Sequence, residues 1–182
     1  PSDVSFNAGI SACEKAGEWQ MALLLFAQMP ALRAAPDVIS YSSSIIACEQ
    51  GSEWQMALFL LFGMPAAGVA PNVISFNAGI SACEKGDEWQ MALHVFSQVP
   101  KARLLPNPVS FSASISVCQR SDQWHVALEL LSQMPSTSAA PDVITCCAGV
   151  NACETGGEWQ RALRRGHQEL LAEIMAFATR NL

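Results

Sequence analysis

The chain repeats one segment at an interval of 35 residues, and this repetition constrains its fold more than any other feature. The segment SFNAGISACEK occupies residues 5–15 and returns at 75–85, with looser copies at 40–50, 110–120 and 145–155. Tryptophan and proline keep the same interval, at Trp19, Trp54, Trp89, Trp124 and Trp159 and at Pro1, Pro36, Pro71, Pro106 and Pro141. A period of about 20 to 50 residues indicates stacked repeats, as in solenoids and propellers.

The first half of each repeat, represented by residues 4–15, has the periodicity of an amphipathic helix. At about 100° per residue, Phe6, Ile10 and Cys13 fall on one side of this segment. Asn7 falls on another side, within a mostly polar stripe. We therefore expect a helix with an apolar seam and a separate polar surface.

The second half of each repeat, residues 18–30 in the first copy, also predicts a helix. Trp19, Ala22 and Phe26 are spaced along one face. A break at Gly17 or its neighbours separates the two helices. We expect each second helix to end at a proline, because proline lacks an N–H donor and collides with the preceding turn. These prolines are Pro30, Pro65, Pro100 and Pro135.

One helical hairpin cannot bury both apolar seams, so neighbouring hairpins must stack. The sequence thus predicts an all-α, right-handed α-solenoid of about five hairpins, with the short, alanine- and cysteine-rich first helices as the inner layer. The expected repeats span residues 1–37, 38–72, 73–107, 108–142 and a degenerate 143–182, which would include a C-terminal capping helix. Residues 164–182 lack the repeat pattern and are alternatively unrelated to the array. Since the chain opens at a repeat boundary, we expect it to be part of a longer array.

Several other function classes are disfavoured by the residue content. Five of the seven cysteines occur once per repeat on an apolar face, which predicts buried free thiols; they are Cys13, Cys48, Cys83, Cys118 and Cys153. A disulfide framework or zinc site would need close pairs. The three histidines share no column, so we expect no enzyme, metal or cofactor. No apolar run approaches the roughly 20 residues that cross a bilayer, so no membrane partner is expected.

These features resemble the pentatricopeptide repeat family. The resemblance rests on 35-residue hairpins with first helices such as NVISFNAGI, second helices with W-x-x-AL, and a closing M-P followed by P-D or P-N. It extends from Ser2 to about Leu163. The family implies binding of single-stranded RNA in chloroplasts or mitochondria, one nucleotide per repeat, with the protein N-terminus toward the RNA 5′ end. It implies no small-molecule substrate.

In that family, two residue columns select the base. One lies in the first turns of the inner helix, and the other is the last residue of the repeat. Carried over to this chain, the first column is Asn7, Ser42, Asn77 and Ser112, and the second is Asp37, Asn72, Asn107 and Asp142. Amide and hydroxyl groups there can hydrogen-bond the Watson–Crick edge of an unstacked base. The fifth copy has Cys147 in the first column, so we assign it no base.

Two further columns complete the expected site. An aliphatic column, one turn earlier, would grip the base faces: Val4, Ile39, Ile74 and Val109. A basic column at the far end of the polar stripe suits phosphate: Lys15, Lys85 and Arg120.

Each column also has a purely structural interpretation. Asp37 and its counterparts precede helices and are expected as N-caps, a role that is compatible with base contact. The aliphatic column serves equally well as core. The basic column serves as a solvated face, since Gln50 and Thr155 interrupt it.

The family's usual correspondence pairs Asn–Asp with U, Ser–Asn with A, Asn–Asn with a pyrimidine and Ser–Asp with G. The chain then predicts the RNA 5′-U-A-(C/U)-G-3′. Its net charge of −6 is unusual for a nucleic-acid binder, although glutamates that begin the second helices would face away from the groove. A protein-binding α-solenoid without RNA activity is the alternative.

Overall fold

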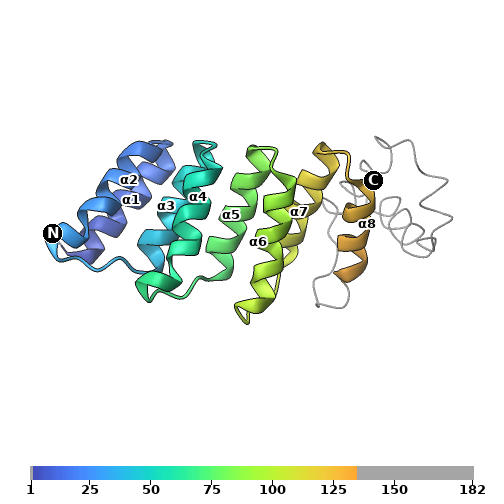
Figure 1. The fold of residues 1–182 in the computed structure, drawn as a ribbon. Helices are drawn as coiled ribbons and strands as arrows, with labels where there is room; N and C mark the ends of the chain where they lie inside the picture. The colour runs from blue at the N-terminus through green and yellow to red at the C-terminus, as the bar shows by residue number, and fades with distance from the viewer. Residues whose placement is uncertain (1, 135–182) are drawn as a thin grey trace, which may run out of the picture.

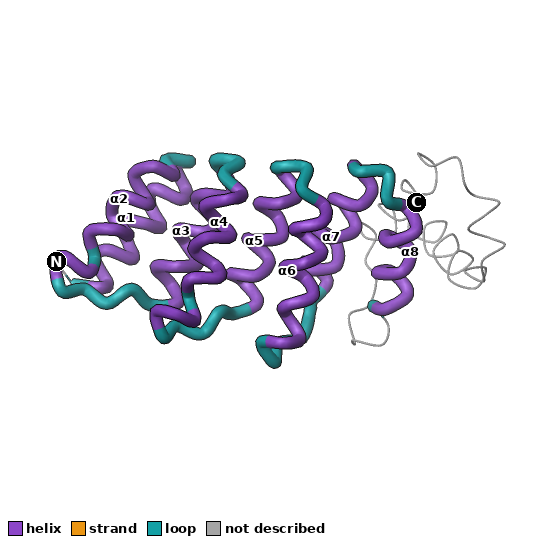
Figure 2. The backbone as a smooth tube through the Cα atoms, viewed as in Figure 1, coloured by secondary structure: helices purple, strands orange, loops and turns teal. Residues whose placement is uncertain are grey.

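The computed structural model describes residues 2–134, which form an α-solenoid of four helical hairpins (Figures 1 and 2). The first helices are α1 (Asp3–Ala16), α3 (Val38–Gln50), α5 (Val73–Lys85) and α7 (Pro108–Arg120). The second helices are α2 (Trp19–Gln28), α4 (Trp54–Gly63), α6 (Trp89–Lys101) and α8 (Trp124–Gln133). The described residues contain no strand, and the all-α solenoid prediction is confirmed. The fifth repeat and the capping helix lie outside the described residues.

The helices form two rows. In one row α1, α3, α5 and α7 pack side by side. Each second helix packs on its own first helix, and α2, α4 and α6 also pack on the first helix of the next hairpin. The second helices make no comparable contact with one another. The closer packing of the first helices is the crowding expected of an inner layer. No helix among residues 2–134 is long and apolar enough to span a membrane.

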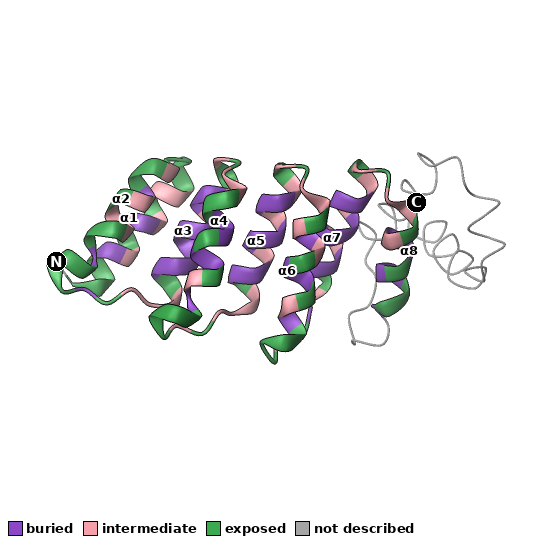
Figure 3. Cartoon of the chain, viewed as in Figure 1, coloured by how far each residue is buried: buried purple, intermediate pink, exposed green. Residues whose placement is uncertain are grey.

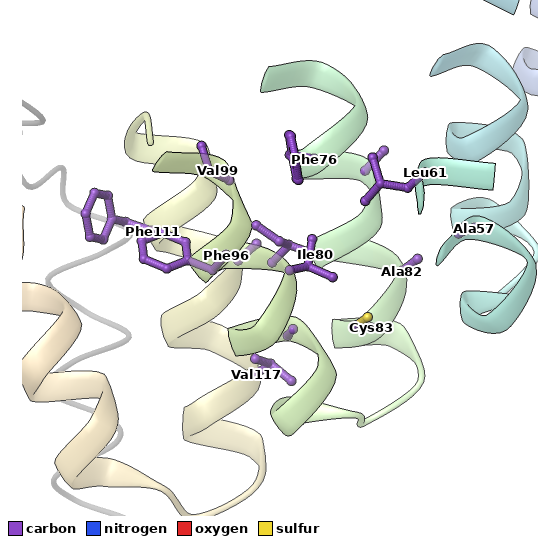
Figure 4. Close-up of a cluster of buried hydrophobic side chains, with 14 of the residues drawn as sticks. Ala57, Leu61, Phe76, Ile80, Ala82, Cys83, Phe96, Val99, Phe111 and Val117 are labelled. Carbon is purple, nitrogen blue, oxygen red and sulfur yellow. The ribbon is translucent and has the colours of Figure 1, made fainter. Parts of the chain in front are cut away.

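The core lies between the two rows and repeats from hairpin to hairpin (Figure 3). One isoleucine from each first helix is fully buried: Ile10, Ile45, Ile80 and Ile115. Figure 4 shows Ile80 among side chains from α4, α5, α6 and α7, including the Phe96 and Phe111 rings, whose centroids are 5.0 Å apart. The four described tryptophans lie in equivalent, half-buried positions at the start of a second helix, and Trp159 lies outside the described residues.

A left-handed residue separates the two helices of each hairpin. Gly17 has a φ of 74°, and the residues 35, 70 and 105 positions later have a φ of 60°, 57° and 58°; they are Ser52, Asp87 and Asp122. The predicted break at Gly17 is confirmed. Only glycine adopts this conformation without steric cost, so the other three hairpins carry a small local strain at the same turn.

The expectation that prolines end the second helices is correct for two of them. Pro30 and Pro65 begin the short 3₁₀ helices η1 (Pro30–Leu32) and η2 (Pro65–Ala67). It is wrong for Pro100, because α6 continues to Lys101. So close to a helix end, proline removes a single N–H donor, and the amide of Ala102, two residues later, still donates to the Gln98 carbonyl at 3.0 Å. Pro135 lies outside the described residues.

The cysteine column is buried except at its first member. Cys48, Cys83 and Cys118 are fully buried free thiols, and their burial was predicted. Cys13 is only half-buried, so the prediction of burial is wrong there. Its helix α1 packs against a neighbouring first helix on one side only in this structure. Cys153 lies outside the described residues.

Candidate functional site

The two columns assigned to base selection meet between successive hairpins. The Nδ2 atom of Asn7 on α1 donates to Oδ1 and Oδ2 of Asp37, at 3.2 and 3.1 Å. In the same way, Nδ2 of Asn77 on α5 donates to Oδ1 of Asn107 at 3.1 Å. Each pair therefore joins the polar stripe of one first helix to the start of the next.

The other two pairs differ. Ser42 on α3 is buried, and its hydroxyl has no hydrogen-bond partner in the described structure, so it is not joined to Asn72. Its side chain ends at the hydroxyl oxygen, one atom short of the amide nitrogen with which asparagine reaches the next capping residue. Ser112 is half-buried on α7, and its expected partner Asp142 lies outside the described residues.

Helix capping places the second column. The Asp37 carboxylate accepts from the N–H groups of Ile39 and Ser40 at 3.0 and 2.9 Å. Asn72 and Asn107 each accept from the N–H group three residues later, at 2.9 Å. The predicted N-caps are thus confirmed at all three described positions. Such a cap contributes about 1 kcal/mol, and it also holds the side chain beside the preceding first helix.

A buried serine completes each cap and was not identified as a site residue from the sequence. These serines are Ser40, Ser75 and Ser110, and all are fully buried. The hydroxyl of each accepts the N–H of the capping residue, at 2.8, 2.9 and 3.2 Å. The sequence does contain a signal for them, because serine recurs at this position with the 35-residue period.

The charge on Asp37 orients Asn7. Burial opposes ionisation of Asp37, but hydrogen bonds from the Ser40 N–H, the Asn7 amide, the Ser40 hydroxyl and the Ile39 N–H outweigh it and lower its pKa. A carboxylate accepts hydrogen bonds only, so Asn7 must turn its NH₂ group toward Asp37. The Asn7 carbonyl oxygen then has no partner in the described structure.

The oxygen of Asn77 is in a different state. The Ser110 hydroxyl lies 2.6 Å from Asn77 Oδ1 and 2.9 Å from Asn107 Oδ1. The corresponding hydroxyl of Ser40 contacts only Asp37, at its carbonyl oxygen (2.9 Å) and Oδ1 (3.2 Å). The two asparagines of the first column therefore present different hydrogen-bonding groups.

The aliphatic column is exposed to solvent. The exposed fractions of Val4, Ile39, Ile74 and Val109 are 77%, 55%, 58% and 58%. The interpretation of this column as core is therefore wrong for all four residues. An open hollow of about 270 Å³ between α5 and α7 is lined by Val109 and Ser112, which belong to the aliphatic and base-selecting columns. In this repeat the exposed aliphatic side chain thus borders the same hollow as the base-selecting serine.

Two of the three basic residues are paired with acids of the preceding hairpin. Lys85 Nζ lies 3.1 Å from Glu49 Oε1. Arg120 contacts Asp87 Oδ1 at 2.6 Å and donates to the Glu84 carbonyl at 2.9 Å. Lys15 is exposed on α1. Phosphate would compete with carboxylates for Lys85 and Arg120, so these two cations should contribute less to nucleic-acid affinity than unpaired cations would.

The glutamates expected at the start of the second helices are found there. Glu18, Glu53 and Glu88 are the residues immediately before α2, α4 and α6. A carboxylate there interacts favourably with the helix dipole. Because the second helices form the other row, these charges are separated from the base-selecting pairs.

Comparisons with known proteins identify similar repeats and folds. A model described as "Pentatricopeptide repeat domain" matches residues 59–120, and one described as "PPR repeat" matches residues 4–33, together half of the chain. The chain is similar to the PPR domain of Arabidopsis thaliana protein-only RNase P 1, solved in complex with tRNA. The TM-score is 0.76 at 16% identity, and the match covers 96% of this chain and 98% of that one. No curated protein sequence matches significantly.

Maize PPR10 is a second structural neighbour, with a TM-score of 0.78 at 21% identity over 97% of this chain. PPR10 in complex with an 18-nt psaJ RNA element gives a TM-score of 0.71 at 22% identity over 88% of this chain. In both cases the match spans 24% of the PPR10 chain. At these identities the likeness establishes the fold alone.

Proposed function

Because the chain belongs to the pentatricopeptide repeat family, we propose that it binds single-stranded RNA and reads one base with each pair of side chains between successive hairpins. The observation that carries this proposal is the Asn7–Asp37 pair, repeated as Asn77–Asn107. The structural neighbours that were solved with tRNA and with a psaJ RNA element support an RNA ligand.

The first pair has the hydrogen-bonding groups that complement uracil. Asn7 is held with its NH₂ toward Asp37, and its oxygen is unpaired. Uracil presents a donor at N3 between two carbonyl acceptors. Asn7 Oδ1 is buried in the structure without RNA, so a side-chain movement must uncover this oxygen before N3–H can donate to it, while the second amide hydrogen reaches a carbonyl. An unpaired buried acceptor costs about 1–3 kcal/mol, and a uracil donor would recover part of this free energy.

The remaining pairs extend the reading to 5′-U-A-(C/U)-G-3′, with the protein N-terminus toward the 5′ end. Ser42 with Asn72 is assigned to A, Asn77 with Asn107 to a pyrimidine, and Ser112 with Asp142 to G. The exposed aliphatic column would cover the faces of the bases, and Lys15, Lys85 and Arg120 would contact phosphates. These assignments follow the family correspondence, and they are proposals for this chain.

We expect modest affinity with a weak dependence on salt. Base contacts contribute about 1–3 kcal/mol each, and ordering a flexible strand opposes them. The net charge is −6, and Lys85 and Arg120 already have carboxylate partners. Few counterions would then be released from RNA on binding. The proposed role is non-enzymatic and needs no cofactor: RNA processing, stability or translation in a chloroplast or mitochondrion.

A protein-binding solenoid is the second candidate, and one observation favours it. Phe59 and Phe62 on α4 are 73% and 44% exposed. They line an apolar hollow of about 530 Å³ that reaches Met91 on α6. This surface belongs to the second-helix row, so a protein ligand there would be independent of the base-selecting pairs.

A double substitution tests the base assignment. Ser42→Asn with Asn72→Asp places the Asn7–Asp37 combination in the second pair, and it should move the second base preference from A toward U. Mobility shifts with RNAs containing UAUG and UUUG, at two salt concentrations and with single-stranded DNA in parallel, measure the ratio. Phe59→Ser on the second-helix row is the control and should leave the ratio unchanged. An unaltered ratio in the double variant would refute base reading by these columns.

A further inference from the structure

We propose that Ser110 is a specificity-determining residue that biases the third pair toward cytosine over uracil. The inference rests on the proposed function, because it concerns how the Asn77–Asn107 pair reads its base. Ser110 is fully buried. It acts by donating a hydrogen bond to the Asn77 amide oxygen and does not contact the RNA.

The hydrogen-bonding capacity of Asn107 fixes the direction of the Ser110 hydroxyl. Asn107 Oδ1 already accepts from the Ser110 N–H at 2.9 Å and from Asn77 Nδ2 at 3.1 Å. A carbonyl oxygen has two lone pairs, so both are occupied by N–H donors. The Ser110 hydroxyl proton is therefore directed to Asn77 Oδ1, which is also the nearer acceptor at 2.6 Å.

The first pair lacks this arrangement although it has the same serine. The Ser40 hydroxyl finds two acceptors on Asp37, the carbonyl oxygen at 2.9 Å and Oδ1 at 3.2 Å. No hydrogen bond joins Ser40 to Asn7, and Asn7 Oδ1 has no partner in the described structure. One serine column thus leaves the amide oxygen of the first pair without a hydrogen-bond partner and supplies a partner to that of the third pair.

The consequence follows from the difference between the two pyrimidines. N3 of uracil carries a proton and needs an acceptor, whereas N3 of cytosine is itself an acceptor and needs a donor. Asn77 retains one Nδ2 hydrogen and only one lone pair after its bonds to Asn107 and Ser110. It is consequently biased toward donation. Because one lone pair remains, the preference for cytosine is several-fold and not absolute.

Ser110→Ala tests the proposal, and Ser40→Ala is its matched control. Both variants lose the hydroxyl that accepts the N–H of the capping residue, so both should lose similar stability in urea unfolding. Fluorescence anisotropy with labelled RNAs of constant flanks measures binding to UACG and UAUG for the third base, and to UACG and CACG for the first. Ser110→Ala should lower the C-over-U ratio at the third base at least threefold, while Ser40→Ala leaves the U-over-C ratio at the first base within twofold.

The possible results distinguish failure of the Ser110 role from failure of RNA base reading as a whole. If the parent protein discriminates at the first two bases but Ser110→Ala leaves the third-base ratio unchanged, the role of Ser110 is refuted and RNA reading stands. An equal fall of the first-base ratio in Ser40→Ala would also refute it, because the serine would then act through capping alone. A parent protein that discriminates at no position overturns the proposed function together with the inference.

Discussion

The indole of Trp54 lies directly against Gly86, and a Cβ atom at residue 86 would be 2.5 Å from Trp54 Cδ1. Trp54 begins α4, whereas Gly86 follows α5 in the next hairpin. Trp19 and Gly51 have the same relationship, with a distance of 2.3 Å. The tryptophan column and these glycines therefore form one feature, in which the second helix of a hairpin packs against the turn of the next.

Gly86→Ala should destabilise the protein, because the added methyl group must displace an indole that is packed between hairpins. Overpacking of this kind typically costs about 1–3 kcal/mol. Gly63→Ala in the last turn of α4 is the control, since a Cβ there meets nothing within 4 Å. It should stabilise by about 0.5–1 kcal/mol, because alanine loses less conformational entropy on folding. Urea unfolding midpoints that fail to move in opposite directions would contradict this account.

The repeat period explains how much of the fold the sequence predicts. Each helix is specified by several copies of the same pattern, so the hairpins, the turn at Gly17 and the caps at Asp37 and Asn72 can be predicted from residues that recur every 35 positions. The acceptor of a serine hydroxyl cannot be predicted in this way. Ser40 and Ser110 occupy one column but donate to different residues, because the capping side chain is a carboxylate in one repeat and an amide in the other.

The aliphatic column shows a second limit of the sequence. Ile39 and Ile74 lie in the first turn of α3 and α5, at the edge of the polar stripe, where periodicity alone assigns them neither to the core nor to the surface. The structure leaves both exposed, whereas Ile45 and Ile80, later in the same helices, are fully buried in the core between the two rows. Pro100 is a third case, since its column ends two second helices but is accommodated within α6.

Asp37 should make stability depend on pH in the acid range. Its pKa is lowered from 3.8, because hydrogen bonds to the carboxylate outweigh the cost of burial. A lowered pKa in the folded state adds stability that is complete above the unfolded value and is lost as the pH falls through the folded value. Asp37→Asn should therefore lose less stability than the parent on acidification below about pH 4. Unfolding free energies at neutral and acid pH measure the difference, and equal losses in both proteins would exclude this role.

The cysteines should differ in reactivity by position. Burial raises the pKa of Cys48 to about 11, of Cys83 to about 12 and of Cys118 to about 11, with Glu53 and Glu88 adding to the shift at the first two. The thiolate is the reacting species, so these three should resist a maleimide at pH 8. Among these four described cysteines, half-buried Cys13 should be labelled first. Mass spectrometry of peptides from the native and the denatured protein gives the order, and early labelling of Cys83 would contradict the packing described.

Ile74→Ala should separate RNA binding from stability. Ile74 is 58% exposed, whereas Ile80 on the same helix is fully buried, so the same substitution at the two positions forms a matched pair. Ile80→Ala should cost about 2–5 kcal/mol of unfolding free energy through the cavity it leaves, and Ile74→Ala should change it by no more than about 0.5 kcal/mol. If Ile74 covers the face of a base, its loss should weaken binding of UACG RNA several-fold in mobility shifts, because apolar surface that the base would bury is removed. Unchanged RNA affinity in a fully stable Ile74→Ala protein would exclude Ile74 from the RNA interface. A large loss of unfolding free energy would show that Ile74 contributes to core packing.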